Sequence, residues 1–210
     1  MWYHRTKQQP GQAPVQAIDR SMGHRGARRA TELAAAVLLA SWLAGCAAPT
    51  GVAQQGSALP PGFVHLHAVA PDVQQDMRYY GSNNFIGRTV AGYQAPACIL
   101  SEPAARAVQA AQAQVRPQGL SIKVFDCYRP QIAVNDFVRW GSDLSDQKTK
   151  PDYYPAVPKT ELFQRGYIAE KSGHSRGSTV DVTLVVVDSM RASKVVRGPL
   201  TDGHEVDMGS

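Results

Sequence analysis

The pattern of apolar and polar positions in this 210-residue chain predicts isolated strands and two clear helices. Residues 101–115 are Ala-rich and repeat apolar side chains every three to four positions, the spacing of a helix that packs through one face. A second helix is predicted over 131–140. Strands are predicted over 63–67, 120–125 and 179–186, where apolar and β-branched residues dominate. Because regular strand–helix–strand units do not follow one another, the pattern agrees with an α+β fold.

The longest apolar run lies near the N-terminus, at residues 33–45, directly after a cluster of arginines. It is too short to span a bilayer comfortably and has the arrangement of a secretory signal; the alternative is a buried core helix. Leu-Ala-Gly before Cys46 also has the form of a bacterial lipobox, in which the cysteine is lipidated and becomes the mature N-terminus. We therefore expect residues 1–45 to be a lipoprotein-type signal segment, with Met22 as an alternative start.

The rest of the chain divides into a tether and a domain. Residues 46–61 are rich in Ala, Gly, Gln, Ser and Pro, the composition of a flexible tether, and residues 62–210 suit one globular domain. The chain's net charge is +5, and its first 45 residues carry six basic and two acidic side chains. The domain is therefore close to neutral. It has no basic stripe that would favour a nucleic-acid partner.

The stretch from 172 to 184 concentrates the side chains that suit chemistry. Asp181 lies inside an otherwise apolar and β-branched strand, which is an unusual place for a carboxylate. His174 precedes that strand across a Ser-Arg-Gly-Ser turn, which can fold the imidazole back toward the carboxylate. Imidazole plus carboxylate, with positions left open, is the ligand set of a catalytic zinc site. The alternative is a surface histidine followed by an acid that is hydrogen-bonded at a strand edge.

The string Ser-Gly-His-Ser-Arg-Gly-Ser-Thr-Val-Asp at 172–181 resembles the S-x-H-x-x-G-x-x-x-D zinc motif of the D-alanyl-D-alanine dipeptidases, within the wider group of zinc D,D- and L,D-peptidases. The resemblance implies that His174 and Asp181 are two of three protein ligands of Zn²⁺. Residues 76–87 resemble the D-x-R-Y … N-F-x-G entry segment of the same family. The resemblance also implies an α+β fold with a small, mostly antiparallel sheet and helices packed on one side.

Three further segments resemble parts of the same family that contact the substrate. Asp-Cys-Tyr-Arg-Pro at 126–130 resembles the segment whose arginine, here Arg129, points into the zinc site and can stabilise an oxyanion. The alternative for Arg129 is an arginine that braces a loop. Tyr167 and Ser172 match the tyrosine and serine that line the dipeptide pocket. Asp207, in Asp-Met-Gly, matches the aspartate that pairs with the free ammonium group of the dipeptide.

The function implied by the resemblance is zinc-dependent hydrolysis of the D-alanyl-D-alanine dipeptide in cell-wall peptide turnover. The family's general base glutamate and third zinc ligand lie in an E-W-W-H string, which these 210 residues do not contain. We therefore expect a truncated, nearly inert member of the family with an exposed apolar patch. Two alternatives stay open: a catalytically inactive lipoprotein that binds cell-wall peptide, and His204 as a substitute third ligand.

Two cysteines remain in the domain once Cys46 is acylated. Cys98 and Cys127 are a candidate disulfide because an exported compartment permits such bonds. The alternative is a pair of buried thiols.

The lipobox makes a testable prediction about location. We expect export and attachment to the periplasmic face of a membrane through a lipid on Cys46. Because Ala47 rather than an acid follows it, the outer membrane is the expected destination in a Gram-negative host. Replacing Cys46 with serine is expected to release the protein from the membrane fraction. Immunoblotting of fractionated cells measures this release. Unchanged membrane association would contradict the assignment.

Overall fold

The computed structural model describes residues 59–198 and 200–208, so the predicted signal segment and Cys46 lie outside the described residues. The strands are β1 (Phe63–His65), β2 (Gln74–Gln75), β3 (Ile99–Ser101), β4 (Leu120–Asp126) and β5 (Asp181–Val186). The α-helices are α1 (Leu66–Val69), α2 (Glu102–Val115), α3 (Gln131–Ser142), α4 (Lys150–Tyr153) and α5 (Ser189–Ala192). The 3-10 turns are η1 (Arg78–Tyr80), η2 (Arg116–Gln118), η3 (Lys159–Glu161) and η4 (Gly173–Arg176).

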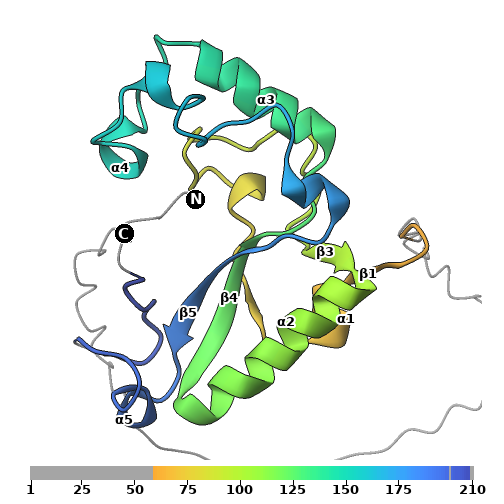
Figure 1. The fold of residues 1–210 in the computed structure, drawn as a ribbon, viewed down its shortest axis with the longest axis vertical. Coiled ribbons are helices and arrows are strands. Elements are labelled where there is room, and N and C mark those ends of the chain that lie inside the picture. The colour runs from red at the N-terminus through yellow and green to blue at the C-terminus, as the bar shows by residue number, and fades with distance from the viewer. Residues whose placement is uncertain (1–58, 199, 209–210) are drawn as a thin grey trace, which may run out of the picture. The chain divides into compact units, whose positions relative to one another are not determined.

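In the described part of the chain, the strands form two small sheets (Figure 1). β1 and β3 pair antiparallel, with Val64 opposite Leu100. In the second sheet β4 is central, with β5 antiparallel on one side and β2 parallel on the other. The predicted α+β fold with a mostly antiparallel sheet is confirmed. The alternation pattern does not predict the two-residue parallel strand β2.

The first strand is shorter than the pattern predicts. β1 ends at His65, and the chain turns into α1 at Leu66, whose side chain is fully buried. The Leu66 N–H donates to the carbonyl of Cys98 (2.9 Å). The turn into α1 therefore ends the strand at His65, where alternation alone would continue it to His67.

The pairing of β4 with β5 brings two carboxylates together at one end of the sheet. The strands pair in step up to Val124 and Val182, after which the register shifts so that Asp126 lies opposite Asp181. The extra residue in β4 is Phe125, which makes this a bulge. A bulge bends its strand and re-aims the side chains that follow it.

Helix α2 packs against β4 through a helical repeat of buried side chains, among them Ala105 and Val108 (Figure 1). Gln112 is polar yet only 2% exposed, because both ends of its amide are bonded. Its Nε2 donates to Ser121 Oγ (3.0 Å) and its Oε1 accepts from the Ile122 N–H (2.8 Å). The core cluster here contains Leu66, Ala70, Val73, Met77, Cys98, Leu100, Ala105, Val108, Ile122, Val124 and Cys127.

Helix α3 packs in a second core cluster that contains no strand residue. Its Phe137 contacts the ring of Tyr79 (4.9 Å between centroids), and its Trp140 contacts that of Phe85 (5.3 Å). Such edge-on pairs are the favoured aromatic geometry. The cluster contains Tyr79, Phe85, Ile86, Val90, Ala133, Phe137, Trp140, Tyr154, Val157, Leu162 and Ile168. Thus α2 lies on the sheet, whereas α3 lies beyond the end of β4 (Figure 1).

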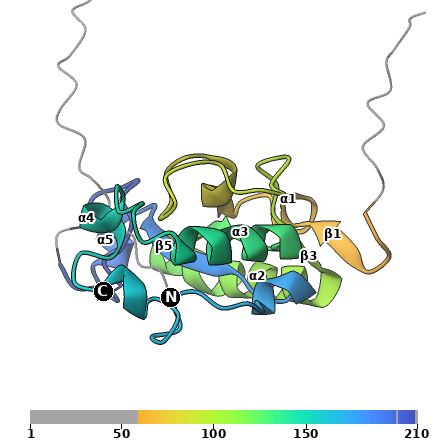
Figure 2. The same ribbon diagram turned by 90° about the horizontal axis from the view of Figure 1, so that it is seen from above.

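The third cluster fixes the far end of the sheet. Leu120, Val186, Ala192 and Val206 are buried together, and the Val206 N–H donates to the Leu184 carbonyl (2.8 Å). β1 and β3 lie near the start of α2 and α5 lies near its end, as both views show (Figures 1 and 2). Within the described residues no helix is long and apolar enough to cross a membrane.

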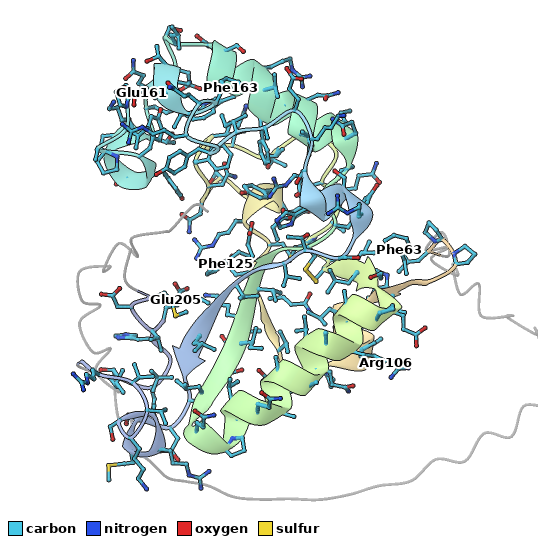
Figure 3. All side chains as sticks on the ribbon, viewed as in Figure 1. Phe63, Arg106, Phe125, Glu161, Phe163 and Glu205 are labelled. Carbon is cyan, nitrogen blue, oxygen red and sulfur yellow. A yellow bond between two sulfur atoms is a disulfide. The ribbon has the colours of Figure 1, made fainter. Side chains whose placement is uncertain are left out.

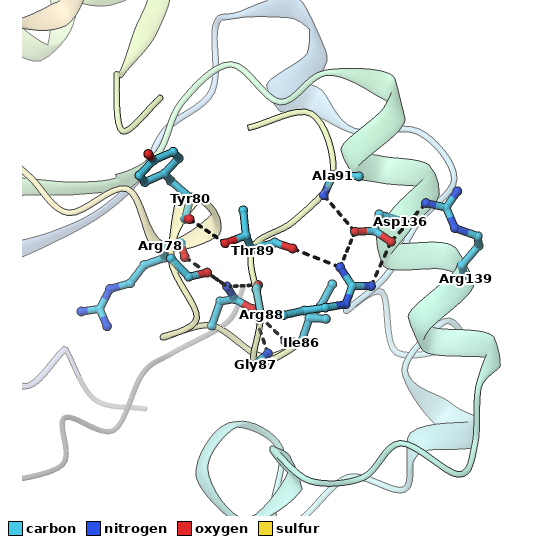
Figure 4. A network of polar contacts seen from close by, with 11 residues as sticks. Arg78, Tyr80, Ile86, Gly87, Arg88, Thr89, Ala91, Asp136 and Arg139 are labelled. Atoms are coloured by element: carbon cyan, nitrogen blue, oxygen red, sulfur yellow. Dashed lines mark hydrogen bonds and ion pairs between the residues drawn. The ribbon is translucent and has the colours of Figure 1, made fainter. Parts of the chain in front are cut away.

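A buried carboxylate ties the loop before β3 to α3 (Figure 4). Asp136 accepts hydrogen bonds from Arg88 Nη1 and Nη2 (2.7 and 3.0 Å), from the Ala91 N–H (2.9 Å) and from Arg139 Nη2 (3.1 Å). These donors, Arg88 first, lower the pKa of Asp136 to about 2. Asn84, fully buried, closes the same loop by bonding the carbonyl of Arg88 (2.8 Å).

This clamp predicts a pH-dependent loss of stability in Asp136→Asn. We expect the free energy of unfolding to fall by about 1.5–3 kcal/mol at neutral pH, measured by urea denaturation, because hydrogen bonds to a charged group are lost. A lowered pKa means that the carboxylate's contribution is complete above its ordinary pKa of 3.8 and is lost as pH falls toward about 2. The stabilities of wild type and variant should therefore converge in acid. Glu170→Gln, at an exposed position, is the control. A constant difference between wild type and Asp136→Asn down to pH 2 would contradict the clamp.

Candidate active site

Four ionisable side chains meet where β4 ends and β5 begins. Asp126 is the last residue of β4, Arg129 follows it by three positions, and Asp181 is the first residue of β5. His174 lies in the turn η4, directly before β5. The strand register and the bulge bring these segments together, although they lie up to 55 residues apart in the sequence.

The turn η4 holds His174 in a defined position. Ser172 Oγ accepts the His174 N–H at the start of the turn (3.3 Å). Gly177 ends the turn in the left-handed region (φ +69°), and a Cβ there would lie 2.4 Å from the ring of Phe63. The turn therefore requires glycine at this position.

The imidazole of His174 is buried and oriented through its Nδ1 atom. Nδ1 lies 2.9 Å from the carbonyl oxygen of Cys127, so in the neutral ring it carries the hydrogen and donates. This leaves Nε2 free to accept, at 3.4 Å from Asp181 Oδ1. A backbone carbonyl on the second ring nitrogen is the usual way in which proteins orient a metal-binding histidine.

Within the described ranges, one group of three or more His, Cys, Asp and Glu side chains has ligand atoms close enough for a metal: Asp126, His174 and Asp181, within 4.8 Å of one another. Asp126 differs from the other two. Its Oδ2 lies 3.3 Å from Nδ1, the ring nitrogen that already bonds the Cys127 carbonyl. His174 Nε2 and Asp181 are therefore the pair that could face a metal, and we call them the metal-facing pair; Asp126 lies behind them.

Asp126 has no exposed surface and is satisfied by its neighbours. The phenol of Tyr93 donates to its Oδ1 (2.7 Å), while Arg129 donates Nε and Nη2 to its Oδ2 (3.0 and 2.7 Å). The sequence pattern did not indicate a role for either Asp126 or Tyr93. An acid three positions before an arginine at a strand end is a weak signal for Asp126, and Tyr93 has none.

Arg129 is held on all sides. Its guanidinium lies over the rings of Tyr79 and Phe137 (5.2 and 4.9 Å) and 3.6 Å from Asp181 Oδ2. Only 14% of its side chain is exposed. The arginine therefore faces the same space as the metal-facing pair with its orientation already set.

The pKa values follow from burial and from these pairings. Burial raises the pKa of Asp126 and outweighs the opposing charge of Arg129. Burial lowers the pKa of His174, but the hydrogen bond to Asp181 and the charge of Asp126 outweigh it and leave the pKa raised. Burial raises the pKa of Asp181, but the hydrogen bond to His174 and the positive charge of His174 outweigh burial and leave the pKa of Asp181 lowered. The protonated imidazole of His174 and the ionised carboxylate of Asp181 therefore stabilise each other.

Of the predicted residues, the structure brings Arg129, His174, Asp181 and Ser172 together. Ser172 Oγ lies 3.5 Å from Arg129 Nη1. Tyr167 packs at the edge of the aromatic cluster around α3. Asp207 is exposed and follows the buried Val206. The hydrogen bonds and ion pairs described above for the site do not involve Tyr167 or Asp207.

Cys98 and Cys127 form a disulfide.

Residues 60–194 match the sequence profile of the D-ala-D-ala dipeptidase family, Peptidase_M15. The chain belongs to this family. It is 38% identical over 128 residues to a D-alanyl-D-alanine dipeptidase of Enterococcus faecalis and 36% identical over 128 residues to one of Enterococcus faecium. A D-alanyl-D-alanine dipeptidase of Streptomyces coelicolor is 38% identical over 122 residues.

These matches cover 58–61% of this chain. The chain in turn spans 60–63% of the length of these relatives, less than two thirds.

The site predicts that Tyr93 supports Asp126 through its phenol. Replacing Tyr93 with phenylalanine removes a hydrogen bond to a buried carboxylate, and we expect the free energy of unfolding to fall by about 1.5–3 kcal/mol in chemical denaturation. Tyr80→Phe is the matched control, because Tyr80 is 42% exposed. Equal stability of Tyr93→Phe and wild type would show that Asp126 does not need this donor.

Proposed function

We propose that this domain takes part in metal-dependent hydrolysis of the D-alanyl-D-alanine dipeptide, with zinc as the metal. The observation that carries the proposal is the orientation of His174: its Nδ1 is bonded to a backbone carbonyl, and its Nε2 faces Asp181 beside the fixed guanidinium of Arg129. The family and the names of the relatives support the same substrate.

The donor set suits zinc. One imidazole nitrogen and one carboxylate oxygen are two of the ligand types found in catalytic zinc sites, which use three protein ligands and keep one position open. His174 and Asp181 would hold the ion. When bound, zinc would polarise the scissile carbonyl and lower the pKa of a bound water.

Arg129 is the residue that we assign to the reaction itself. Addition of water to the peptide carbonyl creates negative charge on its oxygen, and a guanidinium that is already oriented stabilises this charge without reorganisation. Asp126 and the rings of Tyr79 and Phe137 provide that orientation. Because Arg129 stays charged at all accessible pH values, its contribution does not depend on a proton.

The ends of the dipeptide are proposed to meet Ser172, Tyr167 and Asp207. Ser172 Oγ lies next to Arg129, so a hydroxyl and a guanidinium are available together for the substrate's carboxylate end. Asp207 would pair with the free ammonium group. Fixing both ends would restrict the reaction to short, free-ended substrates and would suit a role in cell-wall peptide turnover.

We also propose that the protein acts outside the cytoplasmic membrane, anchored through Cys46. The proposal rests on the lipobox and the preceding apolar run, and a disulfide in the domain suits an oxidising compartment.

The metal pair predicts a specific loss of zinc binding. In calorimetric titrations, His174→Ala and Asp181→Ala should each abolish binding, while His67→Ala, at an exposed position, should leave it unchanged. We expect tighter binding in a form of the domain that carries the family's E-W-W-H segment, because that segment supplies the family's third ligand. Zinc binding that survives in His174→Ala would contradict the assignment.

Zinc affinity should also depend on pH in a defined direction. The ligand is the neutral imidazole, and the pKa of His174 is raised above its ordinary 6.5. Affinity should therefore decline on acidification already from a pH above 6.5. A decline confined to pH values below about 5, where only carboxylates titrate, would point to a site without histidine.

Hydrolysis tests the role of Arg129. The assay uses a form of the domain that carries the family's E-W-W-H segment, and we expect it to release D-alanine from the dipeptide in a zinc-dependent reaction. In that form, Arg129→Ala should lower kcat about 10²–10³-fold, the effect of losing one oxyanion donor, with a smaller change in KM. Binding of the dipeptide without hydrolysis in that form would favour a non-catalytic domain.

A further inference from the structure

The disulfide between Cys98 and Cys127 lies directly behind the metal-facing pair. Both cysteines are almost fully buried, at 1% and 0% exposure. Cys127 stands between the last residue of β4 and the segment that carries Arg129, and its carbonyl oxygen is the acceptor for His174 Nδ1 at 2.9 Å. One residue thus carries both the covalent link and the hydrogen bond that orients the imidazole.

The segment 127–129 has left the sheet and is held from two sides. On one side the Arg129 N–H donates to the carbonyl of His174 (3.3 Å), so this segment and the histidine are joined by two hydrogen bonds. On the other side the Tyr128 N–H donates to the Ile99 carbonyl (3.0 Å), and the disulfide links Cys127 to the residue before β3. The disulfide is the covalent part of this second attachment.

The far end of the disulfide is itself fixed. The Cys98 carbonyl accepts the N–H of Leu66, a fully buried residue, and the Cys98 N–H donates to Gln75 Oε1 (3.3 Å). Through the disulfide, α1 and β2 therefore help to hold Cys127 in position. Both cysteines also pack in the core cluster around Leu66 and α2.

We propose that the Cys98–Cys127 disulfide is a positioning element for the metal ligand His174, because it holds the Cys127 carbonyl where that carbonyl accepts the Nδ1 hydrogen. The metal part of this inference rests on the proposed function; the orientation of the imidazole does not. The disulfide thereby helps to decide which nitrogen of His174 is available at the site, together with Asp126 Oδ2, which lies 3.3 Å from the same Nδ1.

The chemistry of neutral imidazole explains why this matters. One ring nitrogen carries the hydrogen and the other carries the lone pair, and the hydrogen bond to the protonated nitrogen selects the tautomer. If the Cys127 carbonyl moves away, the hydrogen is free to shift to Nε2, where it can be donated to Asp181 Oδ1 at 3.4 Å. The nitrogen that faces the site would then have no lone pair for a metal. Loss of such an outer partner typically weakens metal affinity about 10–100-fold.

The experiment compares wild type with Cys98→Ala/Cys127→Ala in zinc-free, ¹⁵N-histidine-labelled protein, at a pH above the pKa of His174. Two-bond ¹H–¹⁵N spectra report which nitrogen of each neutral imidazole carries the hydrogen, and His174→Ala identifies the signals. Val108→Ala is the control, because Val108 lies in the same core cluster as both cysteines but bonds neither segment.

We expect His174 to carry its hydrogen on Nδ1 in wild type and in Val108→Ala, and to populate the Nε2–H form in the double variant. Zinc affinity in calorimetry should fall about 10–100-fold in the double variant alone. An unchanged tautomer in the folded double variant would overturn the proposal. An equal shift of the His174 hydrogen to Nε2 in Val108→Ala would also overturn it, because general loosening of the core would then explain the effect.

Two further measurements cover the case in which the double variant does not fold. Cys98→Val/Cys127→Ala fills the space that the sulfur atoms leave. Wild-type protein can also be treated with a phosphine, which with one water converts the disulfide to two thiols and becomes the phosphine oxide; an unchanged tautomer after this reduction overturns the proposal. Failure of wild type to bind zinc, with the tautomer shift present, would sink the proposed function and leave the positioning role standing.

Discussion

The buried carboxylate of Asp126 is the constraint on which the rest of the site depends. A carboxylate without exposed surface is costly, by several kcal/mol, unless donors surround it. Arg129 and Tyr93 donate to it, and His174 Nδ1 lies 3.3 Å away. Meeting this requirement fixes the guanidinium and helps to fix the ring, so Arg129 and His174 both face Asp181 before any ligand arrives.

Two packing units meet at this carboxylate. The sheet and α2 supply one side through the core cluster that contains Cys127. The aromatic cluster of α3 supplies the other through Tyr79 and Phe137, which lie beneath the guanidinium of Arg129. The Asp136 clamp joins α3 to the loop that leads toward Tyr93. Stability in the aromatic cluster and geometry at the site are therefore linked through shared residues.

A separate set of charges holds the C-terminal stretch through Glu205, which is labelled beside the sheet in Figure 3. Glu205 accepts from Lys123 (3.0 Å) and lies 3.7 Å from Arg78, and Arg78 stacks over the ring of Phe125 (4.6 Å). Phe125 is the bulged residue between Val124 and Asp126. This network orders the approach to Asp207, the residue that is proposed to meet the ammonium end of the substrate.

The sequence predicts the long elements well, because α2 and α3 each carry a helical repeat of buried side chains and β4 is buried along almost its whole length. The proximity of His174 and Asp181 was also predicted, because the turn before the strand can fold the imidazole back and the string resembles the family's zinc motif; the structure places His174 Nε2 3.4 Å from Asp181 Oδ1.

The role of Asp126 was not predictable from local pattern. Its partner Tyr93 lies 33 residues away, and whether an acid is buried depends on partners that only the fold brings together. The parallel strand β2 and the bulge at Phe125 are likewise set by the tertiary pairing of β4.

The most direct test of the account is the position of zinc in crystals of the zinc-loaded protein, located by anomalous scattering at the zinc edge. We expect one peak about 2.0–2.2 Å from His174 Nε2 and from an oxygen of Asp181, with Nδ1 still bonded to the Cys127 carbonyl and Asp126 still bonded to Arg129. A peak on the Nδ1 side of the ring, coordinated by Asp126, would contradict the assignment of the metal-facing pair and the role given to Asp126.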